Sequence, residues 1–249
     1  MTKYRVGIDT RPDNVTAWVF DLPGCRSISG SREETLALVP IAIGEYLAWL
    51  DTHHARPLDA SEPYEYEIVE EISGSGDDLC FEDDRQAVDS EELERGIRYI
   101  GFAHADLASL LRPLPETVTE WKPPATSVKI DATYNDVRTI RDMAEHVATA
   151  LTFHLRGVGH AAERVPSPDD PKNLQHAYEV TILRLRQLNA EERAGTAYKR
   201  ETARGEAEWS ARKALRRIIN HVRFHTGEAA IRLAWPTLGV PVVLQGPRE

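Results

Sequence analysis

Two histidines, His221 and His225, have a type and spacing that could carry chemistry. They lie in WSARKALRRIINHVRFHTGEAAIRLAW, residues 209–235, which reads as one helix with Ser210 as N-cap and Pro236 as the stop. Residues four apart lie one turn above each other on the same face, about 6 Å apart along the axis. A divalent metal ion would accept one nitrogen from each ring at once. The alternative is a pair of core histidines whose ring nitrogens find protein partners.

The rest of that helix face is apolar. At 100° per residue it also carries Ala214, Ile218 and Ala229, with Glu228 close beside them. The two imidazoles therefore interrupt a stripe that should face the interior of a helical bundle. Each would leave buried ring nitrogens that need partners, because an unpaired buried polar group costs free energy.

Length and composition narrow the class of protein. The chain has 249 residues, enough for one large or two ordinary domains, and 41% of them are hydrophobic. No apolar run approaches the ~20 residues that span a membrane, and the N-terminus lacks a signal-peptide pattern. Cys25 and Cys80 form no spaced metal motif. We therefore expect a soluble protein in the reducing cytoplasm, with no membrane partner.

Charge is distributed unevenly along the chain. Residues 1–90 carry 19 Asp and Glu against 7 Lys and Arg, whereas residues 91–249 carry 21 against 23. This asymmetry indicates two units with different surfaces. The acidic unit would repel phosphate backbones, so we expect no nucleic-acid partner.

The first unit has strand patterns followed by one helix. Apolar alternation or β-branched residues predict strands at 4–8, 15–20 and 26–29, and a fourth at 64–70. Between the third and fourth strands, Ser31 and Glu34 form a capping box that opens a helix. The predicted order is β-β-β-α-β, a small α+β domain over residues 1–72.

The second unit has helical periodicity. Four segments have apolar residues at helical spacing: 97–111, 137–155, 174–188 and 209–235. Asn135 or Asp136 is the expected cap of the second segment, and residues 189–208 are polar with no assigned element. The prediction is an acidic linker over residues 73–90 and a four-helix bundle over residues 91–249.

The N-terminal unit resembles a known family. The β-β-β-α-β order, with DLPGCRSISGS (residues 21–31) joining the third strand to the helix, resembles the HicB-like domains of toxin–antitoxin antitoxins. The resemblance covers residues 3–72. It implies that fold and a capacity to bind a protein partner, and it carries over no catalytic residue.

The helical unit resembles the DinB-like family over residues 91–235. The matching stretches are TIRDMAEHVATAL, LRQLNAEERA and EWSARKALRRIINHVRFH. The family includes metal-dependent S-transferases that use low-molecular-weight thiols. In it, one histidine of the second helix and two of the fourth bind a divalent metal, and the matching positions here are His146, His221 and His225.

Such a triad suits activation of a nucleophile. Three neutral imidazoles hold an ion, with zinc or nickel expected and iron as a further alternative, while leaving positions open for a thiolate or water. The ion lowers the pKa of a bound thiol, so that a nucleophile exists at neutral pH. Glu228, near His225 on the same face, is a weak catalytic candidate: an acceptor for a histidine, a general base, or a surface carboxylate.

Other residues compete for these roles. His154 lies nearer the centre of its helix's apolar arc than His146, but the family motif and the side shared with Asp142 favour His146. His104 interrupts the stripe of the first helix and is expected in a core or pocket wall. Three arginines either form a solvated basic face or meet an anionic thiol or substrate: Arg216, Arg217 and Arg223.

The sequence thus predicts two domains and two candidate functions. The first is a metal-dependent transferase or isomerase that activates a small-molecule thiol toward an electrophilic substrate. The second is a non-catalytic interaction protein, with a structural metal site and a protein partner at the N-terminal domain. A homodimer is left open.

Overall fold

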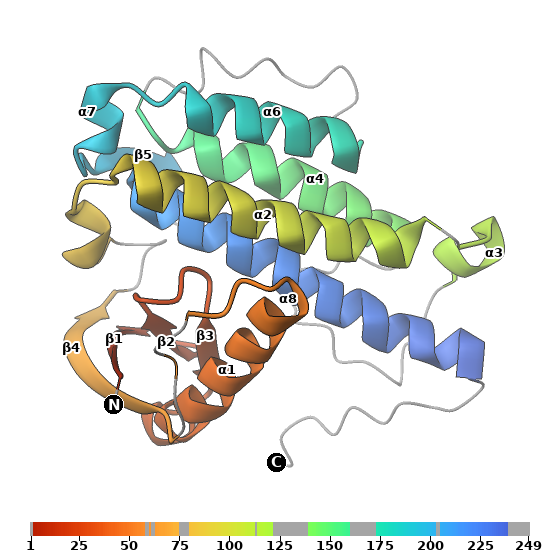
Figure 1. Cartoon of the computed structure of the whole chain (residues 1–249), viewed down its shortest axis with the longest axis horizontal. Helices are drawn as coiled ribbons and strands as arrows, with labels where there is room; N and C mark the ends of the chain where they lie inside the picture. Colours follow the sequence, from red (N-terminus) through yellow and green to blue (C-terminus); the bar gives the residue numbers. More distant parts are fainter. Residues whose placement is uncertain are drawn as a thin grey trace.

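A computed structural model of the chain describes residues 2–57, 60, 63–74, 80–112, 114–121, 139–159, 173–202 and 205–238. Within these ranges, a small mixed sheet with one helix is followed by a helical part with six helices and a β-hairpin (Figure 1). None of the described helices combines the length and apolar composition that crossing a lipid bilayer requires.

The sheet has the predicted β-β-β-α-β order. Its elements are β1 (Lys3–Thr10), β2 (Val15–Val19), β3 (Arg26–Ser29), α1 (Arg32–Thr52) and β4 (Glu65–Ser73). The spatial order is β3-β2-β1-β4, with antiparallel pairing except between β1 and β4, which are parallel. Parallel neighbours need a long crossover, and α1 supplies it.

Helix α1 covers one face of the sheet. It begins where the sequence predicts, because the Ser31 hydroxyl accepts a hydrogen bond from the backbone N–H of Glu34 at 3.2 Å. Its buried residues join Tyr4, Val6 and Ala17 in one core cluster; these helix residues are Val39, Ile43, Tyr46, Leu47 and Leu50.

The other face is covered by residues expected to be linker. Phe81 is buried and meets Phe20 edge to face, with ring centroids 5.2 Å apart. A short 3-10 helix, η1 (Asp83–Arg85), follows it. Part of the predicted acidic linker is therefore packed against the protein, since Cys80, Phe81, Asp84 and Val88 are buried. The division into two domains stays a prediction.

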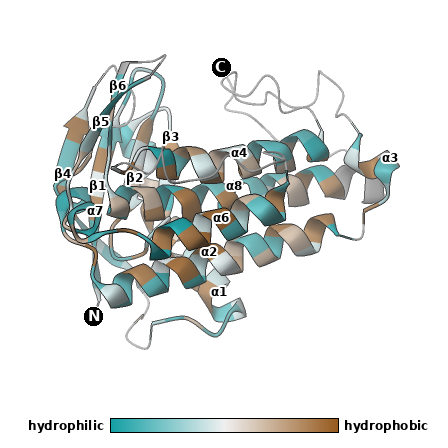
Figure 2. Ribbon diagram, turned by 90° about the horizontal axis from the view of Figure 1, so that it is seen from above, coloured by the Kyte–Doolittle hydropathy of each residue, from teal (hydrophilic) through white to brown (hydrophobic). Residues whose placement is uncertain are grey.

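The helical part comprises α2 (Ser90–Leu111), α3 (Glu116–Thr119), α4 (Ile140–Arg156), α6 (Leu174–Arg186), α7 (Ala190–Arg193) and α8 (Ala211–Leu238). Helices α2 and α4 both pack along α8, and α6 packs on α4. Figure 2 shows apolar and polar residues alternating along α2 and α6, as half-buried helices require. The polar stretch without an assigned element contains α7 and a hairpin, β5 (Tyr198–Thr202) and β6 (Gly205–Trp209).

Helix boundaries agree in part with the sequence predictions. Ser210 caps α8 as predicted, with its hydroxyl accepting from the N–H of Lys213 at 3.2 Å. The stop at Pro236 is wrong, since α8 runs to Leu238. Helix α4 starts at Ile140, because Thr139 and Asp142 form a reciprocal capping box. The caps expected at residues 135 and 136 lie outside the described residues.

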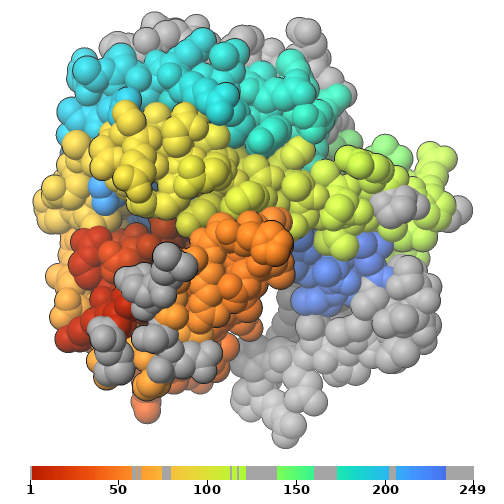
Figure 3. Space-filling view, in the orientation of Figure 1, coloured from red at the N-terminus to blue at the C-terminus, as the bar shows by residue number. Residues whose placement is uncertain are grey.

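Helix α8 contacts both parts of the molecule (Figure 1). On its sheet side, Asn220 donates to the carbonyl oxygen of Gly24 at 3.2 Å. The guanidinium of Arg223 lies 4.3 Å from the ring centroids of both Tyr46 and Trp49. Helix α1 also lies against α2 on the face seen in Figure 3, where the indole N–H of Trp49 donates to Asp106 at 2.8 Å.

Candidate metal centre

Three histidines from two helices come together where α4 crosses α8. They are His146 on α4 and His221 and His225 on α8. Each offers a ring nitrogen, and these three ligand atoms all lie within 4.8 Å of one another. The cluster could hold a metal ion, and it consists of the three histidines expected from the sequence.

The spacing of the rings suits one ion. The centroid of His146 lies 5.0 Å from that of His221 and 4.9 Å from that of His225, and the last two are 4.6 Å apart. A tetrahedral ion with Zn–N bonds of about 2.0–2.1 Å needs nitrogens roughly 3.4 Å apart. The candidate ligand nitrogens lie within 4.8 Å of one another, so the imidazoles would have to turn toward a common point to bind one ion.

Burial favours the neutral form of two imidazoles in the cluster, those of His146 and His221. Burial first, and then the charge of His225, lowers the pKa of His146 from 6.5 to about 4. Burial, together with the charges of neighbouring histidines, lowers the pKa of His221 well below its usual value. Neutral imidazole is the form that binds a metal. Among the described residues, the Nε2 atom of His221 has no hydrogen-bond partner.

Glu228 orients one of the candidate ligands. Its carboxylate lies 2.7 Å from Nδ1 of His225, a ring only 2% exposed. Because Nδ1 faces the carboxylate, His225 would bind a metal through Nε2. A carboxylate beside a metal-binding histidine fixes the tautomer of the imidazole and the orientation of its ring. Of the roles open to Glu228 in the sequence, the contact fits that of an acceptor for His225.

The competing histidines take other places. His154 is buried 5.4 Å from the ring centroid of His221 and 5.3 Å from that of Trp209, outside the group of three. It is more buried than His146, which explains why periodicity alone favours it. His104 is stacked on Tyr178 between α2 and α6, at 4.1 Å between centroids, in agreement with the expected core or wall position.

Two of the three arginines are packed rather than solvated. Arg216 is 7% exposed and donates twice to the buried carboxylate of Asp84, both times at 2.7 Å. Arg223 lies over Tyr46 and Trp49, and burial lowers its pKa. A solvated basic face is therefore the wrong interpretation for these two, because the sheet and α1 cover that side of α8.

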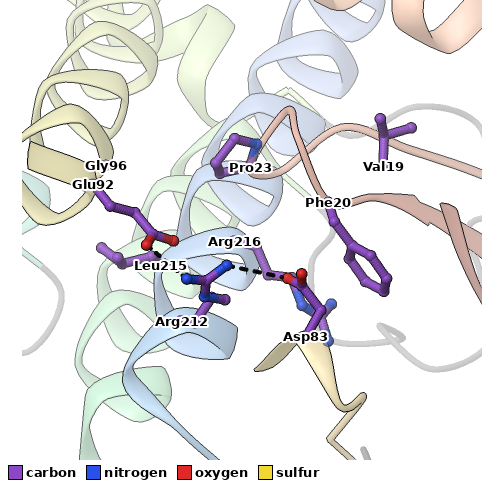
Figure 4. Close-up of a pocket in the computed structure, with 9 residues that line it drawn as sticks. All are labelled: Val19, Phe20, Pro23, Asp83, Glu92, Gly96, Arg212, Leu215 and Arg216. Atoms are coloured by element: carbon purple, nitrogen blue, oxygen red, sulfur yellow. Dashed lines mark hydrogen bonds and ion pairs between the residues drawn. The ribbon is translucent and has the colours of Figure 1, made fainter. Parts of the chain in front are cut away.

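A small pocket lies between the sheet part, α2 and α8 (Figure 4). Arg212 crosses it, meeting Glu92 at 2.8 Å and Asp83 at 3.4 Å. The space of about 20 Å³ is enough for about one water molecule. None of the three clustered histidines lines it, so it is not the candidate site.

Sequence reasoning missed the sheet residues near the histidines. Trp18 on β2 and Arg26 on β3 reach α8: the ring of Trp18 lies 5.3 Å from the guanidinium of Arg217, and the guanidinium of Arg26 lies 5.4 Å from the ring of Phe224, which neighbours His225. Spacing in the sequence does not indicate that Trp18 and Arg26 contact α8, because these residues lie about 190 positions before that helix. Comparison with family models, with curated proteins and with solved structures found no match for this chain.

Proposed function

We propose that this chain binds one divalent metal ion through His146, His221 and His225 and uses it to activate a low-molecular-weight thiol. The reaction class would be a metal-dependent transferase or isomerase acting on an electrophilic substrate. The observation that carries the proposal is the approach of three imidazole nitrogens, from two helices, to within 4.8 Å of one another.

Among the residues that the structure describes, the group has three possible ligands, and that number favours catalysis over a structural role. Structural zinc sites are closed by four protein ligands, whereas catalytic sites use three and keep a position open. The bound ion would lower the pKa of a thiol, so that the thiolate exists at neutral pH. The sulfur would then bond to the electrophilic carbon of the substrate. The leaving group would depart with its electron pair, and the thiol proton would pass to solvent.

The rest of the protein is consistent with this proposal. Helices α2, α4, α6 and α8 would form the four-helix bundle expected of a DinB-like protein, with zinc or nickel as the favoured ions and iron as a third. In this proposal the N-terminal HicB-like part remains available for a protein partner. Glu228 would act as the carboxylate that holds His225 in its metal-binding orientation.

Metal content tests the first half of the proposal. Protein purified without chelator should contain close to one divalent ion per chain by elemental analysis. His146→Ala and His221→Ala should each lose most of it. His154→Ala, a matched change on α4, should keep it. Loss of metal in the His154 variant but not in the His146 variant would reject this ligand set.

Thiol binding tests the second half. The cobalt-substituted protein should develop a thiolate-to-cobalt charge-transfer band when a small thiol is added. If the ion is held but no thiol changes the spectrum, the site is structural. The chain is then better described as a non-catalytic interaction protein.

A further inference from the structure

One side of α8 is open to solvent beside the histidines. Helix α4 packs against the side that carries His225, a residue only 2% exposed. The sheet part and α1 cover another side through Asn220 and Arg223. At 100° per residue, Phe224 and Ile231 lie between these two covered sides.

Phe224 and Ile231 form an exposed apolar strip, 42% and 39% exposed. They are two turns apart on one face, about 10 Å along the axis, on the half of α8 that extends past α1 (Figure 1). Between them, a Cβ on Gly227 would meet nothing within 4 Å among the described residues, apart from its own helix. Single exposed apolar side chains are common on protein surfaces, so what distinguishes this pair is its position beside the histidines.

The apolar strip adjoins the histidine cluster. The ring centroid of Phe224 is 5.2 Å from that of His225. Phe224 also follows His221 by three residues, and Ile231 follows Glu228 by three, so each pair occupies neighbouring positions on the helix surface. Glu228 in turn contacts His225. A small molecule bound to an ion at the cluster would therefore have the apolar strip within reach.

The strip offers hydrophobic contact. The guanidinium of Arg26 lies 5.4 Å from the ring centroid of Phe224, and 42% of the phenylalanine stays exposed beside it. Covering the two side chains would remove apolar area from water, which stabilises a complex. A strongly hydrated ligand would gain little from this surface, whereas an apolar one would gain affinity in proportion to the area it covers.

We propose that the apolar strip binds the carbon skeleton of the electrophilic substrate, which is therefore an apolar molecule. This inference rests on the proposed function and deepens it, because it names the class of the second substrate. The thiolate would bind the ion, and the reactive carbon would lie beside the sulfur. The apolar remainder of the molecule would extend along Phe224 and Ile231.

Matched hydroxamates test the apolar strip, because they bind divalent ions without reacting. Cobalt-substituted protein is titrated with acetohydroxamate and with octanohydroxamate, which share the metal-binding group and differ in the alkyl chain, while the cobalt absorption is followed. Octanohydroxamate should bind about tenfold more tightly or better. Added sodium sulfate should preserve this preference, since hydrophobic contacts are not screened by salt.

Substitutions locate the effect. Phe224→Ala and Ile231→Ala should each reduce the preference to about threefold or less. The affinity for acetohydroxamate should be unchanged in both, which also shows that each variant folds and holds its ion. Leu183→Ala removes a comparable side chain, 55% exposed on α6, and should keep the full preference.

The outcomes separate the possible occupants. Equal affinity for both hydroxamates, or a preference that survives Phe224→Ala and Ile231→Ala, would overturn the proposed substrate surface. If these substitutions convert a dimer into a monomer and the wild type shows no preference, a second copy of the chain covers the strip.

The outcomes also separate this inference from thiol activation. A preference that depends on the strip, in a protein whose cobalt spectrum responds to no thiol, would reject thiol activation and leave the strip as the apolar surface of the metal site. A cobalt site that binds neither hydroxamate would overturn both proposals.

Discussion

At the scale of single residues, Glu228 decides which nitrogen His225 can offer. Removing its charge weakens the hold on Nδ1, and such outer partners typically contribute 10–100-fold to metal affinity. We expect Glu228→Gln to lower zinc affinity by roughly tenfold or more, measured by competition with a chromogenic chelator. Glu191→Gln, on the exposed side of α7, serves as the control and should bind zinc normally. If Glu228→Gln binds zinc as tightly as the wild type, Glu228 does not orient His225 for metal binding.

The same histidines make the metal-free protein sensitive to acid. The pKa of His146 is about 4 when folded against 6.5 for an ordinary histidine, and that of His221 is also lowered. Between these values the unfolded chain binds more protons than the folded one, so stability falls as pH drops from 6.5 toward 4. Well above pH 6.5 these rings are neutral in both states, and they contribute nothing to the pH dependence there.

The variant His146→Gln separates the acid sensitivity caused by this histidine from that caused by carboxylates. Denaturant unfolding of the metal-free protein at pH 7 and pH 5 should show a larger loss of stability for the wild type than for His146→Gln. Glutamine keeps a polar side chain but does not titrate. Equal losses in both proteins would mean that His146 keeps an ordinary pKa when folded.

At the scale of elements, the contact between the turn after β2 and α8 depends on Gly24. Its φ is +91°, and a Cβ there would lie 2.6 Å from a side-chain carbon of Ile219. Alanine would be strained by the backbone and would push against α8, so Gly24→Ala should destabilise by more than about 1 kcal/mol. Urea denaturation measures the change in the free energy of unfolding.

A glycine on α8 itself provides the matched comparison. A Cβ on Gly227 would meet nothing within 4 Å among the described residues, apart from its own helix. Alanine favours a helix interior over glycine, so Gly227→Ala should stabilise by about 0.5–1 kcal/mol. Opposite signs for the two alanine variants are the expected result. A stable Gly24→Ala would show that the turn can move away from α8.

Local chemistry predicted most of the long elements, and it is also present in some that the prediction lacks, such as the capping box of Asn189 and Glu192 that begins α7. Ser31 and Ser210 cap helices as expected, since a cap depends on residues only three positions away. The observed start of α4 at Ile140 is also set by a local signal, the capping box of Thr139 and Asp142. The burial of Phe81 could not be predicted, because it depends on a sheet face formed by residues far earlier in the chain.

In the candidate site, too, some residues have a local signal in the sequence and others depend on long-range packing. The spacing of His221 and His225 is local and was predicted from helical periodicity. The family resemblance indicates His146, whereas helical periodicity alone favours His154. The position of Arg26 against α8 has no local signal in the sequence, because it results from strand pairing and from the packing of the sheet on the helix.

At the scale of the whole molecule, α8 should make metal binding stabilise the sheet as well as the helices. The helix carries two candidate ligands and also contacts Gly24, Tyr46 and Trp49. Zinc at about 100 times its dissociation constant would contribute about 2.7 kcal/mol, which corresponds to roughly 5–10 °C in Tm for a chain of this size. Calorimetry with zinc and with chelator measures this shift.

Two spectroscopic signals test whether that stabilisation is shared. Tryptophan fluorescence reports in part on Trp18 and Trp49 in the sheet part, while far-ultraviolet circular dichroism is dominated by the helices. Both signals should change in one transition, and zinc should move them together. A sheet transition that stays fixed while the helical one shifts would show that the two parts unfold independently.

Strand β4 has a consequence for how molecules of this protein meet in solution. It is the last strand in the sheet order, and an outer strand edge can recruit the same edge of another copy. Four of its nine residues are glutamates: Glu65, Glu67, Glu70 and Glu71. Lys3 and Arg32 pair with Glu67 and Glu71, so the like charges that oppose pairing of two such edges are chiefly those of Glu65 and Glu70. The strand that completes the sheet therefore also discourages its growth into fibrils.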